Sequence, residues 1–363
     1  MMKTHRSVSR LDVRDASSIK RCDHDDKDRG NENKSSQTTI GIFGDIHFQD
    51  VGLSRVIETG DWIYDQFRET GSSLTGIVCL GDVLNTRETV SVQSQSAAIQ
   101  FFERLSQLDV PIHILLGNHD LNLKHDSRIS SLDVLGLPSL RDQFHLYRTI
   151  SVTDIGHRPC VMIPYLEDRT LLKRWIMDNE SRYNYSNMFA FGHLSLPGAI
   201  QRYQKDNRDR VFTKRYMGDR DDKDDDDGAN RDESQRSDRR RTNSVSVPSY
   251  LSRFNYLISG HFHHHHYLND HVLYCGSPMQ HHFGDSGDAG RGICLLKTDG
   301  DTNESHVQFV QNPTWDAFRL VRIQSEHDLE PIEQSRGKHV SVIYENPDIV
   351  PERVKDRLIR AGA

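Results

Sequence analysis

Short apolar runs alternate with amphipathic stretches along much of the chain. The runs with the length of buried strands are residues 39–43, 76–80, 112–116, 160–163, 188–191, 256–258, 272–274 and 292–296. Between the first three of these runs, residues 53–68 and 94–108 carry apolar side chains at helical spacing. Strands that alternate with helices predict an α/β protein built from layered sheets.

Two segments lack any hydrophobic period. Residues 1–37 are polar and carry charges of both signs, which predicts a disordered tail. Half of residues 201–250 are charged, so we predict a disordered insertion at about 204–247. The main domain is then expected at 38–325, with the insertion inside it.

The C-terminal part of the chain has its own pattern. Residues 305–350 alternate in a β-like way, and residues 351–362 have the spacing of an amphipathic helix. We expect 326–363 to be a short accessory or capping segment, too short to complete a domain of its own.

Composition removes several classes of protein. A net charge of −7 excludes a generally basic, histone-like binder of nucleic acids, although a local basic groove stays open. The sequence contains no run of 18 apolar residues, so we expect no membrane-spanning helix. The 5 cysteines are scattered without a C-x-x-C pair, which favours a reducing intracellular compartment. We expect the nucleus or the cytoplasm, with an organelle as the alternative.

The 20 histidines change the picture, because several fall in short polar motifs. Five motifs follow one another along the chain: Asp45-x-His47, Gly81-Asp82, Gly117-Asn118-His119-Asp120, Gly192-His193 and Gly260-His261-Phe262-His263. Any one of them alone is more often part of a turn. All five in this order, four of them directly after strand-like runs, indicate one site at the ends of the strands.

The residue types in these motifs favour a centre of two divalent ions. Carboxylate, amide oxygen and imidazole suit Mn²⁺, Fe²⁺ or Zn²⁺, and the lack of thiolates argues against a structural zinc site. A carboxylate between two ions can hold them about 3.5–4 Å apart, which is the geometry used for hydrolysis of phosphate esters.

The set of motifs resembles the calcineurin-like metallophosphoesterase superfamily, over about Thr38 to Phe318. The resemblance implies a four-layer α-β-β-α sandwich. It also implies a first ion held by Asp45, His47, Asp82 and His263, and a second ion held by Asp82, Asn118, His193 and His261. His119 would act as general acid or orient the phosphate, and Asp120 would tune His119 from behind.

A later block resembles one branch of this superfamily. Gly276-Ser277-Pro278, then Phe283-Gly284-Asp285 and Arg291-Gly292, are similar to the DNA repair nucleases of the SbcD and MRE type and to the recombination endonuclease subunit of T-even phages. This resemblance implies Mn-dependent exo- and endonucleolytic cleavage of DNA, a homodimer, and an SMC-like ABC ATPase partner. Helices 53–68 and 94–108 would be candidates for the dimer face, or ordinary core helices.

Other functions stay open. The chain differs from those nucleases in its insertion between His193 and His261 and in its short C-terminal segment. A small-molecule or cyclic-nucleotide phosphodiesterase is the alternative, and a metal-binding scaffold is a third. Arg87, His281 and His282 are as well explained by surface or turn positions as by phosphate contacts. We expect His264, His265 and His266 at an exposed strand edge, and Trp62 and Trp175 in a core or interface.

Overall fold

The computed structural model describes residues 37–85, 87, 89–123, 125–136, 142–202, 211–213, 247–325, 335–346 and 348–362. Apart from Gln37, residues 211–213 and Val247, the predicted tail at 1–37 and the predicted insertion at about 204–247 lie outside the described residues.

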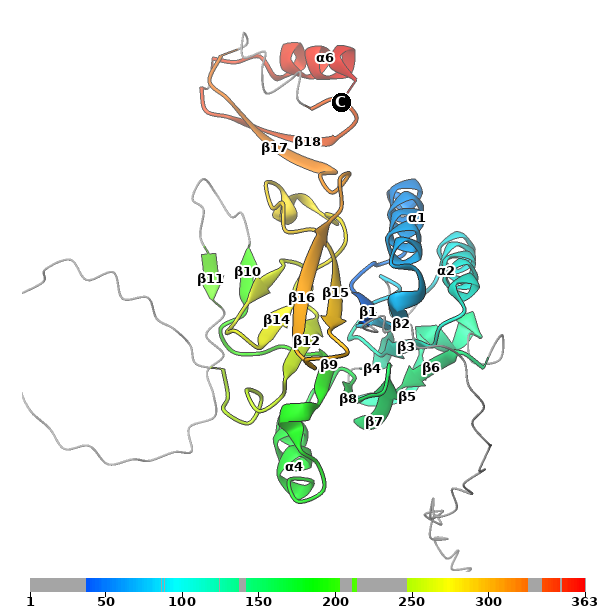
Figure 1. The fold of residues 1–363 in the computed structure, drawn as a ribbon. Helices are drawn as coiled ribbons and strands as arrows, with labels where there is room; N and C mark the ends of the chain where they lie inside the picture. The colour runs from blue at the N-terminus through cyan, green and yellow to red at the C-terminus, as the bar shows by residue number, and fades with distance from the viewer. Residues whose placement is uncertain are drawn as a thin grey trace, which may run out of the picture. The chain divides into compact units, whose positions relative to one another are not determined.

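Six strands form the first sheet, in the order β16-β15-β1-β2-β3-β6 (Figure 1). Their bounds are Thr38–Phe43 for β1, Leu74–Cys79 for β2, Ile112–Leu115 for β3, Phe144–Tyr147 for β6, Gly292–Thr298 for β15 and Ser305–Gln311 for β16. Strands β1, β2, β3 and β6 are parallel, while β15 and β16 run antiparallel to their neighbours. The carboxyl ends of β1, β2 and β3 therefore meet at one edge.

The second sheet also has six strands, in the order β13-β14-β12-β9-β8-β7. Their bounds are Ser151–Ile155 for β7, Arg158–Ile163 for β8, Phe189–His193 for β9, Tyr256–Gly260 for β12, His266–Tyr267 for β13 and Val272–Tyr274 for β14. Strands β8, β9, β12 and β14 are parallel, and the antiparallel strands β7 and β13 close the two edges. All eight strand-like runs of the sequence are strands of these two sheets.

The two sheets pack face to face over a common apolar layer. Ile42 and Val78 of the first sheet share one buried cluster with Phe191 and Ile258 of the second. Each such fully buried side chain contributes about 1.5–3 kcal/mol to stability. Since both faces of the central strands are covered, their sequences are continuously apolar rather than alternating.

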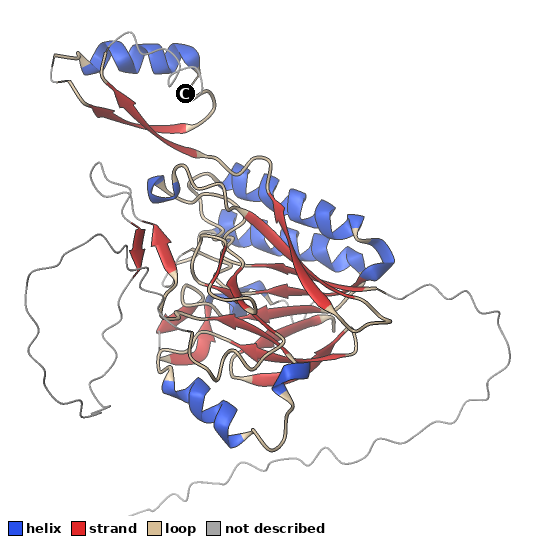
Figure 2. Ribbon diagram, turned by 60° about the vertical axis from the view of Figure 1, so that its left-hand side comes forward, coloured by secondary structure: helices blue, strands red, loops and turns tan. Residues whose placement is uncertain are grey.

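Helices cover the outer faces of both sheets (Figure 2). Helix α1 (Leu53–Glu69) and helix α2 (Val92–Leu105) pack on the first sheet, and helix α4 (Thr170–Asp178) packs on the second. The side chain of Ser91 caps α2 by accepting a hydrogen bond of 3.0 Å from the backbone N–H of Ser94. The predicted four-layer α-β-β-α sandwich is confirmed. Helix α4 was not predicted.

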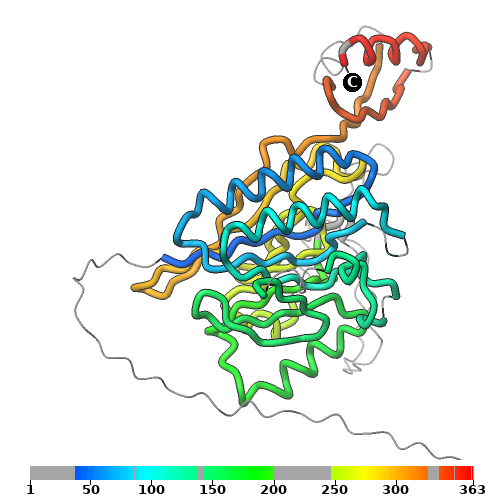
Figure 3. Tube along the Cα trace, turned by 90° about the vertical axis from the view of Figure 1, so that its right-hand side faces the viewer, coloured from blue at the N-terminus to red at the C-terminus, as the bar shows by residue number. Residues whose placement is uncertain are grey.

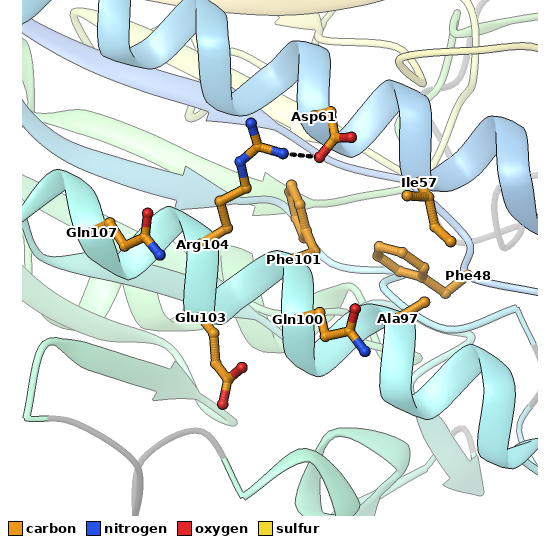
Figure 4. Close-up of a pocket in the computed structure, with 9 residues that line it drawn as sticks. All are labelled: Phe48, Ile57, Asp61, Ala97, Gln100, Phe101, Glu103, Arg104 and Gln107. Carbon is orange, nitrogen blue, oxygen red and sulfur yellow. Dashed lines mark hydrogen bonds and ion pairs between the residues drawn. The ribbon is translucent and has the colours of Figure 1, made fainter.

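Helices α1 and α2 lie side by side (Figures 1 and 3). Arg104 of α2 forms an ion pair with Asp61 of α1 across a pocket of about 400 Å³ (Figure 4). Trp62 packs against the core beneath α1, and Trp175 packs against the core beneath α4, as the sequence suggested.

Shorter elements complete the described chain. They are the pair β4 (Leu121–Leu123) and β5 (Asp126–Ser130), the pair β10 (Ile200–Arg202) and β11 (Val211–Thr213), and five short 3₁₀ helices. Of the helices that the structure describes, none has both the length and the apolar character needed to cross a membrane.

The C-terminal region pairs β17 (Phe318–Ile323) in parallel with β18 (His339–Tyr344), and helix α6 (Pro351–Ala361) follows. Apolar residues of the three elements, including Ile323, Val354 and Leu358, form a small core of their own. The described part of the predicted segment 326–363 thus packs with a strand that precedes it.

Candidate metal centre

The predicted ligands lie where parallel strands of both sheets end. They are Asp45 and His47 after β1, Asp82 after β2, Asn118 after β3, His193 at the end of β9, and His261 and His263 after β12. Because β1, β2 and β3 are parallel, as are β9 and β12, these side chains converge at the carboxyl edge of the sheets.

Backbone hydrogen bonds continue beyond the strands and hold the exit loops together. The N–H of Asp45 donates to the carbonyl of Gly81 at 2.9 Å, and the N–H of His47 donates to the carbonyl of Asp82 at 3.1 Å. Gly117 lies against the same loop, where a Cβ would collide with the Asp82 side chain and backbone. This close approach explains why a glycine precedes Asn118.

Four predicted ligands form what we call the second cluster: Asp82, Asn118, His193 and His261. Oδ1 of Asn118 is 2.6 Å from Nδ1 of His261 and 3.0 Å from Nε2 of His193, and the two ring nitrogens are 3.3 Å apart. Ligand atoms bound about 2.1 Å from one ion lie about 3.0–3.4 Å from each other. Nδ1 of His193 donates to the carbonyl of Leu80 at 2.8 Å, which aims Nε2 into the cluster.

Three other ligands form what we call the first cluster: Asp45, His47 and His263. One ligand atom from each lies within 4.8 Å of the others. Nε2 of His47 faces Nε2 of His263 at 3.2 Å. Nδ1 of His47 is buried and has no hydrogen-bond partner in the described structure. The side-chain ligand atoms of the first cluster are thus joined by one contact of hydrogen-bond length, against three in the second cluster.

The carboxylate of Asp82 lies between the two clusters. Its Oδ2 is 3.5 Å from Nε2 of His193 and 3.8 Å from Nε2 of His47. Its Oδ1 accepts a hydrogen bond of 2.7 Å from the backbone N–H of His119. Oδ1 is thus fixed by the backbone while Oδ2 faces both sets of ligands, as a bridging carboxylate requires.

Backbone strain gathers at these positions. Among the described non-glycine residues, seven have positive φ, and four of them are predicted ligands: Asp45, His47, Asp82 and His261. A non-glycine residue held in this region costs about 1–3 kcal/mol and persists only where the surroundings enforce it. Local strain of this kind is common at functional sites.

In the second cluster, Asp82 and His193 form a buried ion pair. Burial alone would raise the pKa of Asp82, but the charges of His193 and His47 hold that pKa well below its usual range. Burial opposes the charge of His193, yet the nearby Asp82 carboxylate raises the pKa of this imidazole to about 9. Burial lowers the pKa of His261 to about 3, so this ring stays neutral.

The side chain of His119 reaches the centre without joining either cluster. Its ring centre is 4.9 Å from that of His47. Nδ1 of His119 lies 2.7 Å from the backbone carbonyl of Asn85 and donates to it, which leaves Nε2 as the reactive nitrogen.

Asp120 has different partners from those the sequence suggested. Its carboxylate accepts hydrogen bonds from the backbone N–H groups of Asp82, Val83 and Gly117 at 2.8–3.0 Å. The predicted role of tuning His119 is therefore corrected, because Asn85 orients that ring. Asp120 instead fixes the loop that carries Asp82.

A buried network behind the first cluster was not assigned a role from the sequence. Arg291 is 1 % exposed and pairs with Asp285 and Asp288 at 2.9 Å each. It also donates to the carbonyl of His263 at 2.6 Å. Oδ2 of Asp285 lies 3.9 Å from Nδ1 of His263, on the side of the ring away from His47. The Gly-Asp and Arg-Gly pairs of the C-terminal block supply this network.

Three histidines after the last motif differ from expectation. We predicted an exposed strand edge for His264, His265 and His266, but His266 is 8 % exposed and its ring stacks on Tyr274. His264 is paired with Asp288 at 2.8 Å. The prediction was wrong because Asp288 and Tyr274, which contact His264 and His266, come from other segments that the local pattern does not reveal.

His281, which the sequence left open, lies beside the first cluster. Its Nε2 donates to the backbone carbonyl of Asp45 at 2.8 Å, and its ring centre is 4.9 Å from that of His47. Burial lowers the pKa of His281 to about 3. A neutral ring in this position supports the loop that carries Asp45.

The residues present fit two divalent ions. Nε2 of His47 and Nε2 of His263 point at one another, an arrangement that a shared cation between them explains. The second cluster offers a carboxylate, an amide oxygen and two imidazoles at ligand spacing. This donor set, oxygen and nitrogen without sulfur, suits Mn²⁺, Fe²⁺ or Zn²⁺.

The sequence is similar to known phosphoesterases. The model of the family named calcineurin-like phosphoesterase matches residues 38–265, more than half of the chain. A viral protein named as a putative phosphoesterase, 244L of Invertebrate iridescent virus 6, is 24% identical over 268 residues. The matched region is 73% of this chain and 78% of the viral protein.

Two solved structures are similar to this chain. The protein TT1561 of Thermus thermophilus has a TM-score of 0.39 and 10% identity, with 75% of this chain and 98% of that one covered. A dimetal phosphatase from Danio rerio has a TM-score of 0.38 and 11% identity, with 76% and 99% covered.

Proposed function

Because the chain belongs to the calcineurin-like phosphoesterase family, we propose that it cleaves the phosphodiester bonds of DNA in repair or recombination, with two divalent ions, Mn²⁺ first among them. As a member of this family it is a metal-dependent phosphoesterase. The observation that carries the two-ion proposal is the position of Asp82 Oδ2 between the two clusters.

Each ion has its own set of ligands in this proposal. Asp45, His47 and His263 hold the first with Asp82, and Asn118, His193 and His261 hold the second with the same carboxylate. When bound, the two ions neutralise charge on the phosphate and lower the pKa of water so that hydroxide is available near neutral pH.

His119 supplies the proton in this reaction. Because Nδ1 donates to the carbonyl of Asn85, a second proton on Nε2 is directed toward the centre. From there it passes to the oxygen that leaves phosphorus, as general acid catalysis requires. The same nitrogen can instead orient the phosphate. The two roles predict different effects of removing the ring, the first on kcat and the second on KM.

The preference for DNA rests on the C-terminal block. Gly276-Ser277-Pro278 and Arg291-Gly292 resemble motifs of the repair nucleases. In this structure Arg291 links this block to the last motif by donating a hydrogen bond to the carbonyl of His263. The exo- and endonucleolytic activity, the homodimer and the SMC-like ABC ATPase partner follow from the same resemblance. Helices α1 and α2 would be candidates for the face that a second copy covers in that assembly, or ordinary core helices.

The chain's net charge favours a second candidate, a small-molecule or cyclic-nucleotide phosphodiesterase. A net charge of −7 disfavours long-range attraction of a polyanion such as DNA, whereas a small diester needs only the centre itself. A metal-binding scaffold is the third candidate. The cysteines that the structure describes as free, Cys79, Cys160, Cys275 and Cys294, support the proposal of a reducing intracellular compartment.

The test is hydrolysis by the full chain loaded with Mn²⁺. Linear single- and double-stranded DNA are assayed beside bis-p-nitrophenyl phosphate, with Asp82→Ala and His119→Ala as site variants and His306→Ala, an exposed histidine of β16, as control. Cleavage of DNA that both site variants lose supports the proposal. Cleavage of the small diester alone moves the substrate to small phosphodiesters. If the chain binds the ions but hydrolyses neither DNA nor the small diester, the result supports the metal-binding scaffold.

A further inference from the structure

We propose that a pocket beside the second cluster binds the nucleobase attached to the phosphate under attack. The pocket measures about 510 Å³, within the range of small-ligand sites. Its walls come from the β4–β5 region, the segment between β6 and β7, the loop after β8, and helix α4. This inference rests on the proposed phosphodiesterase function and names the part of the substrate that gives specificity.

Tyr165 joins the pocket to the metal centre. Its side chain lines the pocket, and its ring centre lies 6.1 Å from that of His261 and 6.2 Å from that of His193. The backbone N–H of Tyr165 donates to the carbonyl of Leu116 at 2.8 Å, which anchors the loop after β8 to the end of β3. A group in the pocket is thus one aromatic ring away from two ligands of the second ion.

The lining suits a flat, uncharged ring. Apolar and aromatic side chains contribute the larger part of the wall, among them Leu121, Ile150, Leu171 and Trp175. Trp175 is itself held by stacking on Tyr183, with ring planes 17° apart. Aromatic side chains bind nucleobases by stacking with little dependence on sequence.

The charges around the pocket disfavour a second phosphate as its occupant. Arg148 is already engaged by the carbonyl of Ser127 at 2.9 Å and by the carboxylate of Asp133. The acidic residues Glu167 and Asp168 also line the pocket, and Oδ1 of Asp168 accepts hydrogen bonds from the backbone N–H and the hydroxyl of Thr170. An anion would meet these two acidic residues, whereas a neutral base places only its polar edge near them. The phosphate therefore stays at the ions and the base enters the pocket.

The experiment compares two diesters that differ only in their bases. Thymidylyl-thymidine is assayed beside the same diester with abasic tetrahydrofuran sugars, using the full chain loaded with Mn²⁺. We expect kcat/KM for the thymidine diester to be about tenfold higher, since each stacked base adds binding of this order. Equal values for the two diesters would overturn the inference while leaving phosphodiesterase activity established.

Two variants on α4 localise the effect. Leu171, 44% exposed, lines the pocket, and Met177, 58% exposed, does not. We expect Leu171→Asp to remove the advantage of the thymidine diester and to leave hydrolysis of the abasic diester unchanged. Met177→Asp, which adds the same charge to the same helix, keeps the advantage. An advantage that survives Leu171→Asp would place the base elsewhere.

A binding measurement decides the question without turnover. Saturation-transfer NMR with free thymidine should show contacts to the thymine ring in the wild type and in Met177→Asp, and lose them in Leu171→Asp. If neither diester is hydrolysed, the proposed function fails, but this measurement still tests the pocket. Absence of thymidine signals from the wild type would overturn the inference.

Discussion

The two clusters of the candidate centre differ in how their ligands are held. In the second cluster, three ligand atoms of Asn118, His193 and His261 already lie 2.6–3.3 Å from one another. In the first cluster, only His47 and His263 are that close, and Nδ1 of His47 has no partner in the described structure.

The difference has a structural origin. A backbone carbonyl, that of Leu80, fixes the ring of His193 in the second cluster. The ring of His263 in the first cluster depends on a side chain, Asp285, 3.9 Å away, which Arg291 holds in place. Ligands that are oriented before the ion arrives need less rearrangement, so we expect the second cluster to bind its ion more tightly.

The largest effect should come from Asp82, whose carboxylate faces the ligands of both clusters. We expect Asp82→Asn to lower kcat/KM for a phosphodiester by about 10³-fold, because the site loses the charge that faces both sets of ligands. Calorimetric titration with Mn²⁺ should show weaker binding of both ions. Loss of one ion alone would contradict the bridging position of this carboxylate.

His119 sharpens the comparison because it belongs to neither cluster. We expect His119→Ala to lower kcat by about 10²-fold, the usual size of a general acid contribution, with unchanged binding of both ions. A variant that keeps its kcat and shows only a raised KM would assign His119 to orienting the phosphate.

Asp285 separates the two clusters most cleanly. We expect Asp285→Asn to weaken binding of the first ion by about tenfold, the usual effect of changing a residue that supports a metal ligand. Binding of the second ion should stay unchanged. Asp288→Asn is the matched control, because Asp288 also pairs with Arg291 but faces His264 instead of His263. If Asp285→Asn weakened the binding of both ions equally, the two clusters would not differ in the way described.

His113 shows what a buried histidine outside the clusters does. Burial lowers its pKa to about 4, below the ordinary value of 6.5. Between these values the unfolded chain binds a proton that the folded chain does not, so stability falls as pH falls. From pH 7 to pH 5.5 this loss is about 1 kcal/mol. When urea unfolding is measured at both pH values, the free energy of unfolding of His113→Gln should fall by about 1 kcal/mol less than that of the wild type. An equal fall in the two proteins would contradict this role of His113.

Much of the fold could be predicted from the sequence because its signals are local. Strands buried on both faces read as continuous apolar runs, so residues 39–43 and 76–80 identified β1 and β2 directly. The candidate ligands were predicted in the same way, because each lies at the end of a strand or a few residues beyond it. Parallel pairing then brings them together without any further information.

What could not be predicted depends on contacts between distant residues. Asp120 bonds to backbone groups 37–38 residues away, so its role could not be seen in the motif that contains it. Arg291 reaches the carbonyl of His263 across 28 residues. The burial of His266 depends likewise on Tyr274, a neighbour supplied by a different strand.

Titration of the metal-free chain with Mn²⁺, followed by calorimetry, tests the central claim most directly. We expect each chain to bind two ions with different affinities. His193→Ala should lose the ion that binds more tightly, and His263→Ala should lose the ion that binds more weakly. Binding of a single ion per chain would contradict a centre built from two clusters around Asp82. Two ions whose binding both variants weaken equally would contradict the difference between the clusters.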